Sequence, residues 1–165
     1  FVHWKYAPVP TSFYAEVLKD HIEQFSFISA LQRTSSITVV TQDMNNPTTE
    51  FFLKLQNIGY NIIFRIGSSL LGDLHVLTCS SNVAISYGTF WNAFALRNST
   101  QLHIFTKSCQ SKEHVYPKGE SKGVSFYTFS FRSTGEKYIK KTKIWKNTAY
   151  QRYLVDKYYK IAKCS

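Results

Sequence analysis

Helix-like and strand-like segments alternate along the first two-thirds of the chain, and this order constrains the fold more than any other feature. Apolar residues recur at roughly helical spacing from Thr11 or Ser12 to about residue 33, and the β-branched run Ile37–Thr41 follows. Such a continuous run is typical of a strand buried on both faces. Further helices are expected at 47–58, 69–80 and 90–96, and further strands at 61–64, 83–86 and 102–105. This order predicts an α/β fold with a parallel sheet, flanking helices and right-handed crossovers.

The second expected helix has clear start and stop signals. Asn46 is suited to cap its N-terminus, and Pro47 to occupy its first position. Gly59 follows directly after its expected end, where glycine is favoured.

Beyond residue 107 the pattern changes. Residues 108–122 are polar and are expected to form a loop, whereas Val124–Phe131 alternates aromatic and small residues and suits a strand or an extended segment. Between residues 137 and 163 the chain is rich in Lys and Tyr, and we expect one or two helices that pack back on the sheet. The apolar contacts expected there are Tyr138, Ile144, Trp145, Tyr153, Leu154, Tyr158 and Ile161.

The net charge of +10 is concentrated in the C-terminal part of the chain. Residues 1–117 carry 8 Lys and Arg against 7 Asp and Glu, whereas residues 118–165 carry 12 against 3. A basic segment of this kind is commonly a solvated face, or it contacts phosphates or a membrane surface. No apolar run approaches the roughly 20 residues of a membrane-spanning helix. Because the chain begins at Phe1 inside a strand-like string, we expect a fragment whose true N-terminus is missing.

The three cysteines are widely spaced and odd in number, which indicates neither a disulfide framework nor a paired-cysteine metal site. Cys79 is expected in the core. Cys109 and Cys164 could pair in an oxidising compartment, but the sequence does not establish the distance between them.

Ligands of open parallel sheets bind outside the carboxyl ends of the strands, where loops and helix N-termini converge. The residues found there suit a nucleotide diphosphate, since they offer a carboxylate for a base or ribose, an arginine for charge and a small-residue turn for phosphate oxygens. Applied to the expected strands, the rule selects Gln42, Asp43, Arg65 to Ser69, Tyr87, Gly88, Thr89, Thr106 and Lys107.

The turn after the third expected strand is the main candidate for the phosphates. Gly88 allows close approach of the backbone, Thr89 adds a hydroxyl, and the free N–H groups of a helix opening near Phe90 favour an anion. Each candidate also has an ordinary structural interpretation. Gly88 and Thr89 could form only a tight turn, Asp43 could be a turn or cap residue, and Arg65 could be a surface charge.

Several classes of site are excluded by motif. The four aspartates, at positions 20, 43, 73 and 156, are far apart, so the close carboxylate pair that holds a metal–diphosphate complex is absent and no metal is expected. The glycine patterns of nucleoside triphosphatases and dinucleotide dehydrogenases do not occur, nor does the serine elbow of α/β-hydrolases. The five histidines form no close pair in the sequence.

The string DLHVLTCSSNVAISYGTFWNAFAL, from Asp73 to Leu96, resembles the third conserved motif of α1,2-fucosyltransferases. That motif has an Asp-Leu, then a Leu and a Cys, then a strand ending in Gly-Thr-Phe before an aromatic and Ala-rich helix. Upstream, TVVTQDMNNP is similar to the strand and turn that contact guanosine in fucosyltransferases. YAPVPTSFYAEVL resembles a Pro-rich segment that opens a helix in fucosyltransferase-like algal and fungal proteins. The resemblance covers about residues 6–106.

This resemblance implies one half of the two-domain glycosyltransferase fold called GT-B. Residues 1–110 would form its Rossmann-like nucleotide-sugar-binding domain, and residues 111–165 a basic, aromatic-rich C-terminal extension that packs on it. The implied donor is GDP-fucose and the implied acceptor a glycan. The N-terminal, acceptor-binding half of the same protein would be missing from this chain.

The resemblance also implies positions for the donor. Asp43 would lie near the guanosine, and Ser86, Gly88 and Thr89 near the diphosphate, with Phe90 packing behind them. Asp73 would fix its helix against the site.

The implied transfer inverts the sugar and needs no metal. Arg65 and the turn at Gly88 would stabilise the departing diphosphate. No catalytic base is identified, because Glu16 and Asp20 are expected to be exposed helix carboxylates. The family carries a His-x-Arg-x-Gly-Asp stretch, whereas the start of this chain offers a His and Lys5 without a following Gly-Asp. Either Lys5 replaces the arginine, or the motif lies upstream and this chain is inactive alone.

Two alternatives stay open. The chain could be a catalytically inactive glycosyltransferase-like subunit, or a non-enzymatic nucleic-acid or polyanion binder, although no recognised nucleic-acid motif supports the second. The triplet Asn98-Ser99-Thr100 is an N-glycosylation sequon compatible with the Golgi lumen. In the polyanion binder the phosphate contacts would be Lys140, Lys141, Lys143, Lys146 and Arg152, with Trp145 and Tyr150 stacking.

Overall fold

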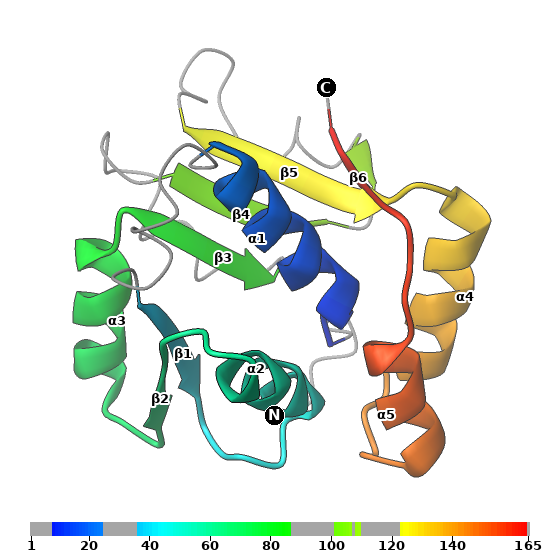
Figure 1. Ribbon diagram of the computed structural model, residues 1–165. Helices are drawn as coiled ribbons and strands as arrows, with labels where there is room; N and C mark the ends of the chain where they lie inside the picture. The colour runs from blue at the N-terminus through cyan, green and yellow to red at the C-terminus, as the bar shows by residue number, and fades with distance from the viewer. Residues whose placement is uncertain (1–7, 25–35, 87–100, 107, 110–122, 165) are drawn as a thin grey trace.

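Helices and strands alternate from residue 11 to residue 86 in the computed structural model, which describes residues 8–24, 36–86, 101–106, 108–109 and 123–164 (Figure 1). The α/β class expected from the sequence is confirmed. The fourth expected helix, at 90–96, lies outside the described residues. In chain order the elements are α1 (Thr11–Gln24), β1 (Ile37–Thr41), α2 (Pro47–Asn57), β2 (Ile62–Ile66), α3 (Leu70–Cys79), β3 (Asn82–Ser86), β4 (Gln101–Phe105), β5 (Val124–Phe129), α4 (Arg132–Thr142), α5 (Ala149–Asp156) and β6 (Ile161–Lys163).

The strands form two hydrogen-bonded groups. β1 and β2 pair in parallel, in register from Ile37 opposite Ile62 to Thr41 opposite Ile66. The second group has the order β3-β4-β5-β6, in which β3, β4 and β5 are parallel and β6 is antiparallel to β5. The four-stranded group is therefore a mixed sheet, with three parallel strands and one antiparallel strand, and among the described residues no strand pairing joins it to β1 and β2.

The caps of α2 follow the local sequence signals. The side chain of Asn46 accepts a hydrogen bond from the Thr48 backbone N–H, and Pro47 occupies the first helical position. Gly59 has φ +100° just beyond the helix, a conformation that side chains disfavour. α3 begins one residue later than expected, because Ser69 serves as its cap and accepts from the Gly72 N–H.

Two apolar cores lie on opposite faces of the four-stranded sheet. One joins α1, the sheet and the C-terminal helices and is rich in aromatic rings, with Phe13 and Tyr127 fully buried at its centre. The other lies against α3 and includes Leu102 and Ile104. Because successive side chains of a strand point to opposite faces, β4 contributes to both cores and is buried along most of its length.

The segment from residue 123 onward is joined to the rest of the fold by specific contacts. α5 packs against α2, where Lys54 Nζ lies 3.1 Å from Asp156 Oδ2. It also packs against α1, where Thr11 Oγ1 donates to the Val155 carbonyl at 3.1 Å. Figure 1 shows α4 and α5 together at one end of the molecule and α3 at the other.

Three burial expectations are wrong. β1 is half-buried along its length rather than covered on both faces. Ile144, Tyr153 and Tyr158 are exposed rather than apolar contacts. Cys79 is exposed rather than in the core, because it lies about 200° around α3 from Leu77, which packs against the sheet.

Cys109 and Cys164 form a disulfide, with their Cα atoms 5.5 Å apart. The bridge ties the residues after β4 to the last strand of the sheet. Within the described ranges, no helix has the length and apolar character needed to cross a bilayer.

Candidate functional site

The loops that follow β1 and β2 meet at one edge of the parallel pair. Thr41 and Ile66 are register partners at the ends of these strands, and the Gly67 N–H donates to the Thr41 carbonyl at 3.0 Å. Gly67 has φ +56°, and a Cβ there would lie 3.5 Å from the Gln42 carbonyl oxygen. The fold thus brings Gln42 and Asp43 to the same edge as the start of α3, as the strand-end rule predicts.

Asp43 is exposed in the turn before α2. Its Oδ1 accepts from the Asn45 backbone N–H at 2.7 Å, and its carbonyl accepts from Thr41 Oγ1 at 2.9 Å. One carboxylate oxygen therefore stabilises the turn, in agreement with the structural interpretation of this residue. Among the described residues no donor to Oδ2 is present, so the carboxylate keeps acceptor capacity toward solvent.

A charged cluster lies where β2 leads into α3. Asp73 is buried in the first turn of α3, where its Oδ1 accepts from the Ser68 hydroxyl and lies 3.8 Å from Arg65 Nε. Asp73 thus holds its helix to the end of β2. The Arg65 guanidinium lies over the same helical turn, because a Cβ at Gly72 would be 3.2 Å from Arg65 Nη2.

The Arg65 side chain lies within ion-pair distance of Asp73, but not all of its N–H groups have a hydrogen-bond partner among the described residues. Its Nε is buried and has no hydrogen-bond partner among the described residues, while its side chain as a whole is 36% exposed. The Leu70 and Leu71 N–H groups, in the first turn of α3, have no intrahelical acceptor, as at the start of any helix. A guanidinium beside free helical N–H groups favours an anion chemically.

Among the other predicted site residues, Ser86 and Thr106 lie in the described part of the chain. Ser86 ends β3, and its backbone pairs with Phe105 of β4. Thr106 is buried and used by the fold, since its N–H donates to the Tyr127 carbonyl at 2.7 Å and its hydroxyl to the Ser108 carbonyl at 3.3 Å. The remaining candidates, Tyr87, Gly88, Thr89, Phe90 and Lys107, lie outside the described residues. The structure therefore brings Asp43 and Arg65 to one edge and leaves the predicted phosphate turn untested.

A polar network under α1 was missed by sequence reasoning. The Tyr127 hydroxyl on β5 donates to Asp20 Oδ2 on α1 at 2.9 Å and lies 3.1 Å from His103 Nδ1 on β4. Since the tyrosine proton is directed to Asp20, the hydroxyl oxygen accepts from Nδ1 of His103. Asp20 could have been recognised, because it follows Phe13 by seven residues and Val17 by three and so shares their buried face.

The environment of the network shifts the pKa values of Tyr127 and His103. Burial, and then the hydrogen bond to Asp20, raise the pKa of Tyr127 above its usual range. Burial lowers the pKa of His103 to about 4, with the Lys163 cation contributing and Asp20 opposing. Asp20 is thus an anchored carboxylate that holds α1 to the sheet, not the exposed helix carboxylate that was expected.

In the described part of the chain, His, Cys, Asp and Glu side chains form no group of three that could hold a metal ion. Comparison of the chain with protein-family models, with curated proteins and with solved structures finds no match.

Proposed function

We propose that this chain is the donor-binding half of a glycosyltransferase, a Rossmann-like half of a GT-B fold that binds a nucleotide diphosphate sugar. The observation that carries the proposal is the edge formed by the loops after β1 and β2, where the Arg65 guanidinium lies over the first turn of α3 and Asp43 follows the end of the neighbouring strand. A carboxylate for the nucleoside and a cation with helical N–H groups for the diphosphate are the groups such a ligand needs.

GDP-fucose is the proposed donor and a glycan the proposed acceptor. The support for this choice is the sequence resemblance to α1,2-fucosyltransferases at Asp73–Leu96 and at the strand before Asp43. The Cys109–Cys164 bridge adds support for a secretory location, since disulfides persist in oxidising compartments. Transfer would invert the sugar without a metal, with Arg65 stabilising the departing diphosphate.

Calorimetric titration with GDP, UDP, ADP and CMP tests the nucleotide class. We expect GDP to bind most tightly and EDTA to leave its affinity unchanged. Arg65→Gln should weaken GDP binding by about tenfold or more, because a charge-assisted hydrogen bond contributes roughly 1.5–3 kcal/mol. Arg132→Gln is the matched control, since Arg132 is exposed on α4 and pairs only with Glu136 within the described residues.

Three results would separate the alternatives. Tighter binding of UDP than of GDP would contradict the assignment as a fucosyltransferase. Equal GDP affinities of the Arg65→Gln variant and the parent would contradict the assignment of the β1–β2 edge as the nucleotide site. GDP binding without transfer, measured with the chain joined to an acceptor half, would indicate an inactive subunit. Gly88→Ala tests the phosphate turn expected from the sequence, and it should also weaken GDP binding in a folded protein.

A further inference from the structure

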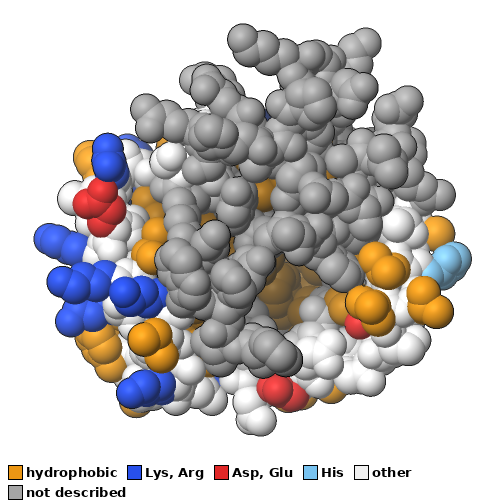
Figure 2. Space-filling view, turned by 180° about the vertical axis from the view of Figure 1, so that it is seen from behind, with side chains coloured by type: hydrophobic (Ala, Val, Ile, Leu, Met, Phe, Trp, Pro, Cys, Tyr) orange, Lys and Arg blue, Asp and Glu red, His pale blue; other side chains and the backbone are white. Residues whose placement is uncertain are grey.

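Five lysines lie on α4 and on its connection to α5: Lys137, Lys140, Lys141, Lys143 and Lys146. This set is called the lysine face below. All five are exposed, and Figure 2 shows Lys and Arg side chains gathered at the side of the molecule that α4 and α5 form.

Among the described residues, no acidic side chain pairs with the lysine face. The acidic side chains described between residues 123 and 164 are Glu136 and Asp156, and each is engaged elsewhere. Glu136 Oε1 lies 2.8 Å from Arg132 Nε, and Asp156 Oδ2 lies 3.1 Å from Lys54 Nζ. In the part of the chain that the structure describes, no carboxylate lies within ion-pair distance of the five lysines.

Stabilisation of the C-terminus of α4 explains the positions of only some of these lysines. Lys140 and Lys141 lie in the last turn of α4, where a cation interacts favourably with the helix dipole. Lys143 is the C-cap residue of α4 and shares this benefit, whereas Lys146 lies beyond the helix and receives little of it. Five like charges close together repel one another, which favours an anionic partner that spans them.

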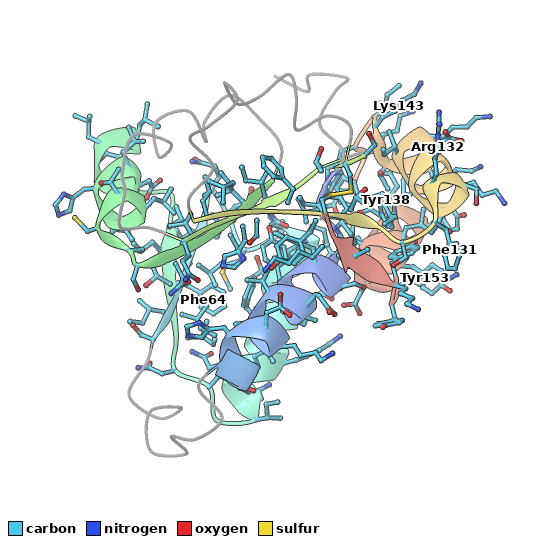
Figure 3. The ribbon with its side chains drawn as sticks, turned by 90° about the horizontal axis from the view of Figure 1, so that it is seen from above. Phe64, Phe131, Arg132, Tyr138, Lys143 and Tyr153 are labelled. Atoms are coloured by element: carbon cyan, nitrogen blue, oxygen red, sulfur yellow. A yellow bond between two sulfur atoms is a disulfide. The ribbon has the colours of Figure 1, made fainter. Side chains whose placement is uncertain are left out.

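Exposed aromatic rings accompany the cations. Phe131 is 64% and Tyr153 57% exposed, and Figure 3 shows both projecting outward at the end of the molecule that carries Arg132 and Lys143. Lys157 Nζ lies 6.0 Å from the centre of the Tyr153 ring. An exposed ring beside the Lys157 ammonium, at the same end of the molecule as Lys143, suits a polymer that has both anionic groups and apolar ring faces, such as a chain of acidic sugars.

The disulfide distinguishes among polyanions. The Cys109–Cys164 bridge indicates an oxidising compartment, whereas nucleic acids and the strongly anionic cytoplasmic leaflet belong to reducing ones. Basic clusters outside the cell interior commonly bind sulfated polysaccharides. We propose that the lysine face binds an acidic polysaccharide bearing sulfate or carboxylate groups. This surface is separate from the β1–β2 edge, so the proposal holds whether or not that edge binds a nucleotide.

Heparin, a sulfated polysaccharide, is the probe. The folded chain is titrated with fluorescently labelled heparin at several salt concentrations, in parallel with a short DNA duplex and phosphatidylserine vesicles. The test variant is Lys140→Gln/Lys143→Gln. The control is Lys19→Gln on α1, outside the lysine face, and it is compared with the single variant Lys140→Gln.

We expect saturable heparin binding that the test variant weakens about tenfold or more at roughly 0.1 M salt, with a salt slope lower by about 2. The control should lose less than about threefold, because distant charges are screened. Tyr153→Ala should weaken heparin binding without changing the salt slope. Equal losses in the test and control variants, or no binding of heparin, would refute the proposal. So would binding of DNA or vesicles as tight as that of heparin.

Discussion

The Tyr127 hydroxyl on β5 donates a hydrogen bond of 2.9 Å to the Asp20 carboxylate on α1, across a sequence separation of 107 residues. Because Tyr127 also receives the Nδ1–H of His103, one buried phenol joins a helix to two strands. This contact fixes α1 over the sheet face on which the aromatic core is built.

Tyr127→Phe should lower the free energy of unfolding by about 1–3 kcal/mol, because Asp20 and His103 would both lose their partner in a buried setting. Urea denaturation followed by circular dichroism measures the change. Tyr150→Phe is the control, since Tyr150 is 56% exposed, and it should be neutral. A neutral Tyr127→Phe would mean that the network does not hold α1.

Acidification should destabilise the fold between pH 6.5 and 4. The pKa of His103 is lowered from 6.5 to about 4 in the folded chain, so the unfolded chain binds this proton first as the pH falls. The contribution of neutral His103 to the free energy of unfolding is fully present above pH 6.5, and up to about 3 kcal/mol of it is lost by pH 4. His103→Asn keeps a donor near the Nδ1 position and does not titrate, so its stability should fall less over this range. Parallel pH profiles for the variant and the parent would contradict the assignment.

Reduction should destabilise the protein through the Cys109–Cys164 bridge, whose ends are 55 residues apart in the sequence. The chain-entropy relation gives about 4 kcal/mol for a loop of this size. Thermal unfolding with and without dithiothreitol measures the effect. Cys79→Ser should respond to reductant as the parent does, because Cys79 is outside the bridge. A Cys109→Ser/Cys164→Ser variant should show no response.

Gly135→Ala should destabilise the protein although alanine favours helices. A Cβ at position 135 would lie 2.9 Å from Cδ2 of Phe129, a ring packed against Phe105, Tyr138 and Tyr159. Since this ring has no room to move, overpacking should cost about 1–3 kcal/mol and exceed the helix-propensity gain of about 1 kcal/mol. Ser133→Ala, at an exposed position of α4, is the control and should be neutral. A more stable Gly135→Ala would show that the ring can shift.

Arg152→Ala should cost about 1–2 kcal/mol, because Arg152 joins α5 to α2 through several charge-assisted hydrogen bonds. Its Nη1 donates to the Asn45 carbonyl and to Asn147 Oδ1, each at 3.0 Å, and its Nη2 pairs with Glu50. Arg132→Ala removes a single exposed pair within α4 and should cost less than about 0.5 kcal/mol. Chemical denaturation of both variants tests the difference, and equal costs would mean that the α2–α5 contact adds little.

Features that depend on neighbouring residues could be predicted from the sequence. The extent of α2 follows from Asn46, Pro47 and Gly59, because a cap and a stop act within one turn of the helix. The strands β1 to β4 follow from apolar runs. The parallel pairing of β1 with β2 follows from the α2 crossover between them, and it brings the loops that follow Thr41 and Ile66 to one edge.

Contacts between distant segments depend on the tertiary structure and could not be predicted from local patterns. Asp20 looked like a surface carboxylate because its donor, Tyr127, comes from a strand far along the chain. The sequence left open whether Cys109 and Cys164 form a disulfide. Their Cα atoms are 5.5 Å apart because β6, next to Cys164, pairs with β5. Local patterns set which residues can face inward. The partner that each one meets depends on how the segments pack, which no short stretch of sequence encodes.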